Sequence, residues 1–166
     1  MHIVLVEPEI PQNTGNIART CSVTGCTLHL VHPLGFSTED KYLKRAGLDY
    51  WDMLDIYHYD SLAEVLEQFS EQNIYYTSTR AAQGYHQVEY SQNDVLVFGK
   101  ETAGLPVTFL EKNYDSCIRI PMINEARSLN LANSVAIILY EALRQTGFSD
   151  FKIKGNLPAI KTEGKK

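Results

Sequence analysis

The chain has 166 residues, of which 44% are hydrophobic and 21% charged, and its formal net charge is −5 at pH 7. This length and composition predict one globular domain with a single core. No apolar run reaches the roughly 20 residues of a membrane helix, and the N-terminus lacks the pattern of a signal peptide. We therefore expect a cytoplasmic protein without a membrane partner. The acidic balance argues mildly against a nucleic-acid binder, although a local basic patch would suffice for binding.

Strands are predicted where short apolar, β-branched runs end at Pro, Gly or polar residues, namely at residues 2–7, 27–31, 54–59, 74–78, 95–98 and 117–121. Helices are predicted from apolar periodicity and capping residues, namely at 13–25, 39–46 and 61–71, in a short stretch from Pro106, and from about residue 130 onward. This alternation predicts an α/β domain with a mostly parallel sheet and helices on both faces.

The domain is expected to span residues 1–150, without an internal repeat or boundary. Residues 151–166 form a Lys-rich tail, which we expect to be partly disordered. Contact between this tail and RNA is the alternative.

The three cysteines, Cys21, Cys26 and Cys117, fit no disulfide framework. No further Cys or His lies near them at the spacing of a zinc site. We expect buried free thiols and no bound metal.

Polar side chains crowd the segment between the strand at 117–121 and the last helix. Seven of them can bond to a ligand: Asn124, Glu125, Arg127, Ser128, Asn130, Asn133 and Ser134. Capping of the helix accounts for one or two. The remainder favour a ligand-binding loop at a helix N-terminus.

Two more loops follow predicted strands, and ligands of open α/β sheets bind beyond the carboxyl ends of the strands. In the first loop, Asn13, Asn16 and Arg19 are three residues apart and share one helix face. They are either a cap and a solvated arginine, or a group that holds a ribose and its phosphate. In the second loop, Gly99 and Gly104 permit either a close approach to a ligand or a tight turn.

Glu101 is the only acid of the second loop and is a candidate base or hydrogen-bond acceptor. The loop lacks the GxxxxGK pattern, and no GxGxxG follows a predicted strand. A nucleoside triphosphatase and an ordinary dinucleotide site are therefore disfavoured.

The segments NTGNIAR, FGKETAGLP and IPMINEARSLNLANSVAIILYEALR resemble, in this order, the three motifs of the SPOUT RNA methyltransferases. Together with EPEIPQNTGNIART and the PLGF…KRAGLDYW segment, they are most similar to the small tRNA 2′-O-methyltransferases that modify the wobble nucleotide, position 34. The resemblance covers residues 2–148. It implies a C-terminal trefoil knot, a homodimer, S-adenosylmethionine as cofactor, and the anticodon region of tRNA rather than DNA as partner. Two alternatives stay open: another RNA site, and a non-catalytic RNA-binding module.

The resemblance also assigns roles to individual residues. Catalysis or its support falls on Arg19, Asn13, Asn130 and Tyr140. Cofactor contacts fall on Thr77, Gly99, Glu101, Gly104, Ile120, Ser128 and Leu129. Candidates for RNA contact are Asn16, Lys41, Lys44, Arg45 and Arg127, although a solvated helix face would also explain the three between 41 and 45. Because a guanidinium stays protonated, we expect Arg19 to bind phosphate and stabilise developing charge rather than act as a base.

Overall fold

The computed structural model describes residues 1–37, 54–123, 126–149 and 151–155. The helix predicted at 39–46 lies outside these ranges, as do Lys41, Lys44 and Arg45. Within the described residues, no helix combines the length and the apolar composition needed to cross a bilayer.

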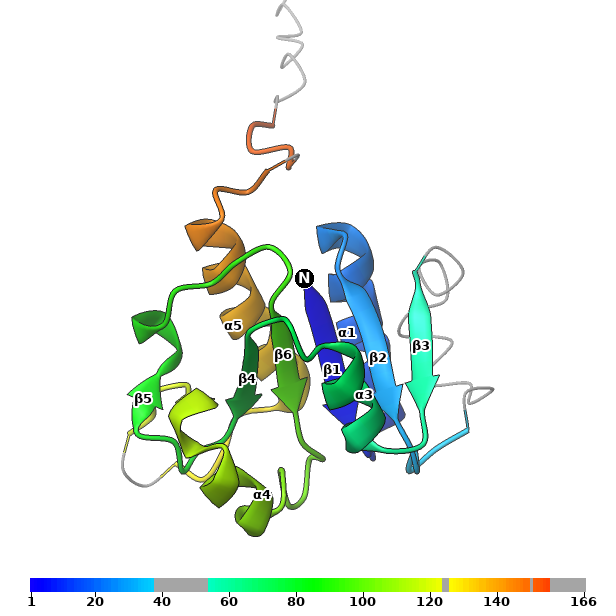
Figure 1. The fold of residues 1–166 in the computed structure, drawn as a ribbon. Coiled ribbons are helices and arrows are strands. Elements are labelled where there is room, and N and C mark those ends of the chain that lie inside the picture. Colours follow the sequence, from blue (N-terminus) through cyan, green and yellow to red (C-terminus); the bar gives the residue numbers. More distant parts are fainter. Residues whose placement is uncertain (38–53, 124–125, 150, 156–166) are drawn as a thin grey trace, which may run out of the picture.

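A seven-stranded sheet forms the centre of the described chain (Figure 1). In chain order its strands are β1 (His2–Val6), β2 (Thr27–Val31), β3 (Ile56–Tyr59), β4 (Ile74–Thr77), β5 (Gln83–Gly84), β6 (Val95–Phe98) and β7 (Cys117–Arg119). Their spatial order is β3-β2-β1-β6-β4-β7-β5, and neighbouring strands are parallel throughout. The carboxyl ends of the strands therefore lie at one edge. The predicted α/β class is confirmed, while the knot stays a prediction.

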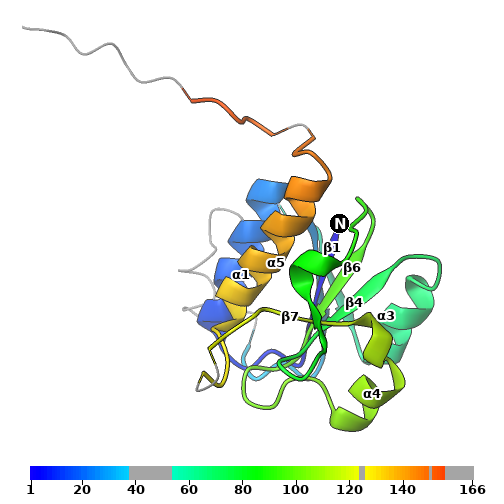
Figure 2. The same ribbon diagram turned by 90° about the vertical axis from the view of Figure 1, so that its left-hand side faces the viewer.

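Helices cover both faces of this sheet, as predicted. They are α1 (Pro11–Thr24), α3 (Leu62–Gln68), α4 (Val107–Lys112) and α5 (Leu131–Gln145), with 3-10 turns η1 (Tyr85–Gln87) and η2 (Tyr114–Ser116). α1 and α5 pack side by side on one face, and α3 and α4 lie on the other (Figure 2).

Strand alternation divides the core into two layers. Ile3 and Leu5 of β1 pack in the cluster beneath α1 and α5, whereas Val4 and Val6 pack in the cluster beneath α3 and α4, because successive side chains of a strand point to opposite faces. Such two-sided burial explains why the strands read as continuous apolar runs. Cys21, Cys26 and Cys117 are free and buried, as predicted.

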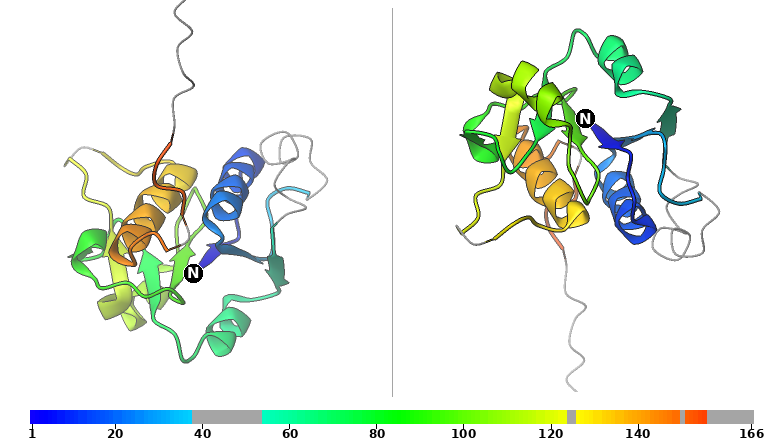
Figure 3. Two further views of the ribbon diagram at one scale, coloured as in Figure 1. Left: turned by 90° about the horizontal axis from the view of Figure 1, so that it is seen from above. Right: turned by 90° about the horizontal axis from the view of Figure 1, so that it is seen from below.

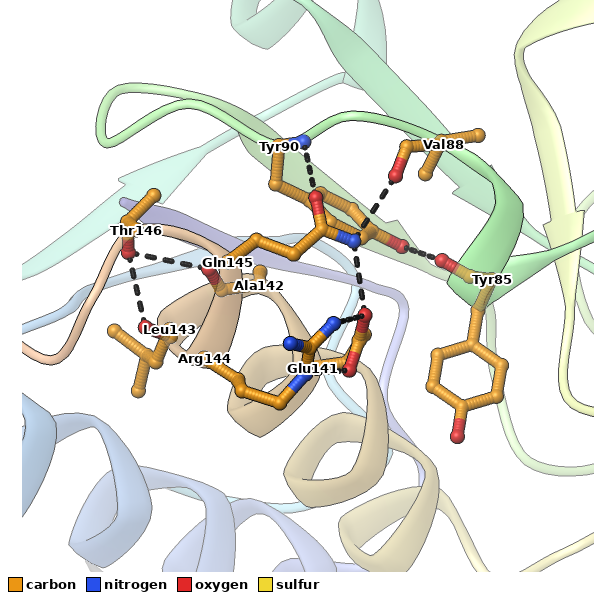
Figure 4. Close-up of polar contacts among 9 residues, drawn as sticks. All are labelled: Tyr85, Val88, Tyr90, Glu141, Ala142, Leu143, Arg144, Gln145 and Thr146. Atoms are coloured by element: carbon orange, nitrogen blue, oxygen red, sulfur yellow. Dashed lines mark hydrogen bonds and ion pairs between the residues drawn. The ribbon is translucent and has the colours of Figure 1, made fainter.

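The last helix is held at both ends. At its start, Asn130 caps the helix by accepting from the N–H groups of Ala132 and Asn133. Near its end, the Gln145 carboxamide accepts from the Tyr90 N–H at 3.0 Å and donates to the Val88 carbonyl at 3.1 Å (Figure 4). α5 is thereby fixed to the segment that follows β5.

The observed bounds match the prediction for β2 and β6 and differ elsewhere. α1 begins at Pro11, before the predicted residue 13, because proline suits the first helical position. The predicted helix at 61–71 ends at Gln68, and the predicted strand at 117–121 ends at Arg119. β5 lies between the predicted strands at 74–78 and 95–98, where no element was predicted, since two residues carry no readable periodicity.

Candidate active site

Beyond the carboxyl ends of β4, β6 and β7 lies a cavity of about 620 Å³. Figure 3 (right) views the molecule from this edge, where the loops after the strands meet the first turns of α1 and α5. The lining combines backbone from these loops with apolar side chains such as Leu105, Ile118 and Ile138. The arrangement follows from the parallel sheet, which gathers loops from distant parts of the sequence.

The seven residues predicted for cofactor contact all line this cavity: Thr77, Gly99, Glu101, Gly104, Ile120, Ser128 and Leu129. Asn13, Asn130 and Arg127 line it as well. The structure thus brings together residues that are up to 117 positions apart in the chain, as for the Asn13–Asn130 hydrogen bond. Their roles toward a ligand stay predictions.

Glu101 holds the first loop against the second. Its carboxylate accepts from the Glu9 N–H at 2.8 Å, from the Ile10 N–H at 3.2 Å and from Asn13 Nδ2 at 3.0 Å. Both carboxylate oxygens are thus engaged by donors of the first loop, which fixes the direction of the side chain. An orienting role therefore fits Glu101 better than general-base catalysis.

Asn13 extends this hydrogen-bonded connection to the third loop, the polar segment that precedes α5. Its side chain is 5% exposed, and its Oδ1 accepts from Asn130 Nδ2 at 2.9 Å. Asn130 Oδ1 in turn accepts from the Ala132 N–H at 2.9 Å. Each amide orientation is fixed by its partners, a carboxylate at one end and helix N–H groups at the other. A chain of Glu101, Asn13 and Asn130 thus ties the three loops together.

The glycines of the second loop are required by the loop itself. A Cβ at Gly99 would lie 2.3 Å from the Gly104 carbonyl carbon and from the Leu105 nitrogen. Gly104 has φ +67°, a left-handed conformation that favours glycine. The Gly104 N–H donates to the Lys100 carbonyl at 2.8 Å. The tight-turn interpretation therefore accounts for both glycines, with or without a ligand.

Two acidic residues after β1 secure the same loop. Lys100 Nζ contacts Glu7 Oε2 at 2.7 Å, and the Thr102 hydroxyl donates to Glu9 at 2.7 Å. This hydroxyl contact and the Thr102 N–H lower the pKa of Glu9. At the neighbouring strand end, the Thr77 hydroxyl donates to the Val97 carbonyl at 3.0 Å. That contact occupies the Thr77 side chain within the protein.

Asn16, Arg19 and Tyr140 do not belong to the cavity lining. Asn16 and Arg19 are exposed on the outward face of α1, and Tyr140 is 45% exposed on α5. α1 and α5 pack side by side (Figure 2), so exposed side chains on the outward sides of the two helices share one surface. This surface also carries the exposed apolar residues Val23 and Ile137.

Apolar side chains recur at helical spacing along α5 and form one face of this helix. Val135, Ile138, Leu139 and Ala142 of that face are buried in the layer between α5 and the sheet. The face is therefore core, and Ile137 and Tyr140 lie on a different one.

Several residues that line the cavity were not predicted: Ile10, Ser78, Thr79, Lys100, Arg119 and Met122. Most lie directly after β4, β6 or β7, so the carboxyl-end rule could have found them. Ile10 follows no such rule. No group of three or more His, Cys, Asp or Glu side chains within the described ranges could hold a metal ion.

A family model described as the SpoU rRNA methylase family matches residues 1–140. A tRNA (cytidine(34)-2'-O)-methyltransferase of Yersinia pestis is 46% identical over 160 residues, which is 93% of this chain and 99% of the relative. An enzyme of the same name from Saccharophagus degradans is 45% identical and matches 91% of this chain and 99% of its own.

Solved structures agree with these relatives. One, described as giving structural insights into the 2-OH methylation of C/U34 on tRNA, is 42% identical with a TM-score of 0.81 and covers 87% of this chain and 95% of its own. Another is the SpoU methyltransferase AviRb of Streptomyces viridochromogenes in complex with AdoMet. It is 26% identical with a TM-score of 0.78, over 88% of this chain and 57% of that one.

Proposed function

This chain belongs to the SpoU rRNA methylase family, and we propose that it is a tRNA 2′-O-methyltransferase acting on the ribose of nucleotide 34. The position follows from the relatives named for cytidine 34 and from the structure described by methylation of C/U34. The observation that supports the proposal most directly is the Glu101–Asn13–Asn130 chain, which draws three loops to one cavity.

S-adenosylmethionine is the methyl donor in this proposal, as in the AviRb structure that contains AdoMet. The cavity suits such a molecule, because exposed apolar side chains of its lining, such as Val107 and Leu129, offer contacts for an adenine ring. Gly99, Ile120 and Ser128 would hold it. Once bound there, it supplies a methyl group on a positively charged sulfur, which an oxygen nucleophile can accept without a metal.

Residues of the chain position the ribose 2′-oxygen and stabilise the negative charge that develops on it. In the reaction the ribose 2′-oxygen gains the methyl group and loses its proton. Alignment of that oxygen can lower the barrier by several kcal/mol, with about 7–11 kcal/mol as the upper range. Arg19 cannot accept the proton, because its guanidinium remains charged. It binds the adjacent phosphate through its planar fork and stabilises the charge that develops on the oxygen. The proton leaves to phosphate or to water.

Nucleoside mass spectrometry of tRNA from a strain that lacks the gene tests the activity. We expect the 2′-O-methyl group at position 34 to disappear and to return with the wild-type gene but not with Arg19→Ala. An unchanged profile would contradict the proposal, and loss of a methyl group elsewhere would assign another RNA site. Arg19→Lys keeps the charge but loses the fork, so we expect turnover to fall about tenfold or more. Near-normal turnover would exclude bidentate binding.

The protein acts as a homodimer in this proposal, with the outward surface of α1 and α5 as the interface. Val23, Ile137 and Tyr140 are 54%, 37% and 45% exposed, so two adjacent helices offer large apolar side chains for a contact. Arg19 lies on the same surface and outside the cavity lining of its own protomer. A two-fold contact there would bring Arg19 toward the cavity of the partner.

Mixed dimers test this sharing. Arg19→Ala and Leu129→Arg, which places a charged side chain in the cavity lining, should each be inactive alone. If Arg19 serves the partner's cavity, half of the sites in a mixed dimer are intact, and an equal mixture regains roughly a quarter of wild-type activity. Activity that stays absent in verified mixed dimers would show that Arg19 serves its own protomer.

A further inference from the structure

Ile10 is an exposed apolar residue at a position where helix chemistry favours a polar one. It is the N-cap of α1, with φ −111° and ψ 110°, and its side chain makes no capping hydrogen bond. Isoleucine is among the poorest N-cap residues, and Ser, Asn or Asp at such a position stabilises a helix by about 1 kcal/mol. Residues that break a local rule without a structural gain are candidates for function.

The side chain of Ile10 also lacks a structural role as core. It is 41% exposed and it lines the cavity. Val107 and Leu129, which line the same cavity, are 44% and 40% exposed. The cavity therefore has an apolar rim, to which Ile10 contributes from the N-cap position of α1.

The backbone around Ile10 is held firmly. The N–H groups of Glu9 and Ile10 both donate to the Glu101 carboxylate, at 2.8 and 3.2 Å. The preceding Pro8 carbonyl accepts from the Gly35 N–H at 2.9 Å, and Pro11 follows at the first helical position. These contacts hold the exposed side chain of Ile10 at the entrance of the cavity. Because the segment is already ordered, it loses little conformational entropy when a ligand binds.

We propose that Ile10 is the contact surface for the nucleobase of the nucleotide whose ribose is methylated, an inference that rests on the proposed function. Bases of single-stranded RNA are splayed out and packed on protein side chains when they are recognised. An aliphatic side chain has no donor or acceptor, so it cannot distinguish the 4-amino group of cytosine from the 4-oxygen of uracil. Ile10 accordingly accepts both pyrimidines and positions the nucleotide without reading its identity.

Ile10→Ser separates this role from a structural one, because serine is the better cap. We expect the thermal midpoint of unfolding to stay equal or rise, and kcat/KM for tRNA to fall about tenfold with the Kd for S-adenosylmethionine unchanged. The ratio of kcat/KM for C34 over U34 should stay constant. Ile153→Ser is the matched control, since Ile153 is 74% exposed and lies away from the cavity, and it should leave all these values unchanged.

A substrate without the base gives the decisive measurement. Ligated tRNA half-molecules that carry cytidine, uridine or an abasic ribose at position 34 retain the 2′-hydroxyl in each case. If Ile10 contacts the base, Ile10→Ser lowers kcat/KM about tenfold on cytidine but less than twofold on the abasic substrate. If Ile10→Ser lowered kcat/KM by the same factor on the cytidine and abasic substrates, the proposal would be overturned. Weaker binding of S-adenosylmethionine or loss of the dimer in Ile10→Ser would overturn it as well. Failure of the wild-type protein to methylate any of these substrates would instead contradict the proposed function.

Discussion

At the scale of single residues, Gly99 shows how a backbone contact can determine a residue type. Its Cα faces the Gly104–Leu105 peptide so closely that a Cβ would lie 2.3 Å from two backbone atoms. Neither atom can rotate away, because both belong to the loop that Gly99 begins. The backbone on one side of the loop must therefore move if any side chain is added.

We expect Gly99→Ala to lower the free energy of unfolding by about 2 kcal/mol or more. The same shift of the loop should weaken S-adenosylmethionine binding, measured by calorimetry on the folded fraction. Gly155→Ala is the matched control, because a Cβ at Gly155 meets nothing within 4 Å. Equal stability and equal affinity of the two variants would show that the loop can shift without loss of unfolding free energy or of S-adenosylmethionine binding.

Residue types predicted the site better than they predicted its contacts. The amides and glycines of three loops indicated one ligand site, because the carboxyl ends of parallel strands share an edge. The sequence does not reveal that Asn13 bonds both to Glu101 and to Asn130, since these partners are distant in the chain. Ile10 was missed because exposed isoleucine gives no signal until the helix start is known.

At the scale of elements, the position of α5 depends on a carboxamide near its end. The Gln145 side chain forms three hydrogen bonds, two of them to the backbone of Val88 and Tyr90 and one to Glu141 (Figure 4). Val88 and Tyr90 are buried, so water cannot easily replace the lost partner.

Gln145→Leu should lower the free energy of unfolding by about 2 kcal/mol, because it leaves a buried N–H and a buried carbonyl unpaired. Urea denaturation measures this loss, and faster amide exchange at Tyr90 would locate it. Arg144→Gln removes the neighbouring ion pair, in which the arginine side chain is 63% exposed, and should cost under about 0.5 kcal/mol. Similar losses of unfolding free energy in both variants would contradict the conclusion that Gln145 fixes the end of α5.

Strands β1, β2 and β3 are joined by a buried imidazole. His29 is 1% exposed; its Nε2 lies 3.1 Å from His2 Nδ1 and its Nδ1 lies 2.9 Å from the Tyr59 hydroxyl. The rings of Tyr57 and Phe69 pack against it. Burial, with a smaller contribution from His2, lowers the pKa of His29 to about 4.

A histidine with a lowered pKa in the folded state makes stability depend on pH. Between about pH 6.5 and pH 4 the unfolded chain binds a proton that folded His29 refuses, so stability is lost as pH falls through this range. The loss attributable to His29 is at most about 3 kcal/mol. In His29→Phe, the free energy of unfolding should fall less steeply from pH 7 to pH 4, whereas His86→Phe, an exposed control, should retain the wild-type slope. Equal slopes in all three proteins would contradict this assignment.

Elements were predicted best where both faces of a strand are buried, as in β2 and β6. They were predicted worst where long-range contacts define them. β5 exists because Gln83 and Gly84 pair with Ile118 and Arg119 of β7, a partner that lies far along the chain. α1 begins at Pro11 without a local capping side chain, because the backbone before it is held by Glu101.

At the scale of the whole molecule, the outward surface of α1 and α5 would link assembly to activity in the proposed homodimer. The buried sides of both helices already fill the core, whereas Val23, Ile137 and Tyr140 remain partly exposed in the protomer. A stable dimer needs an interface of about 1,600 Å² with an apolar centre. Two adjacent helices with these side chains can provide such a centre.

A charge placed in that centre should dissociate the dimer without unfolding the protomer. Ile137 is 37% exposed, so lysine at this position remains hydrated in the monomer but would lie unpaired in the interface. We expect sedimentation velocity of Ile137→Lys to give a monomer with an unchanged circular dichroism spectrum and with methyl transfer reduced at least about a hundredfold. Tyr57→Lys, on β3 and 49% exposed, is the control for surface charge and should stay dimeric and active. An active monomer of Ile137→Lys would show that each protomer holds a complete site, and an active dimer would move the interface elsewhere.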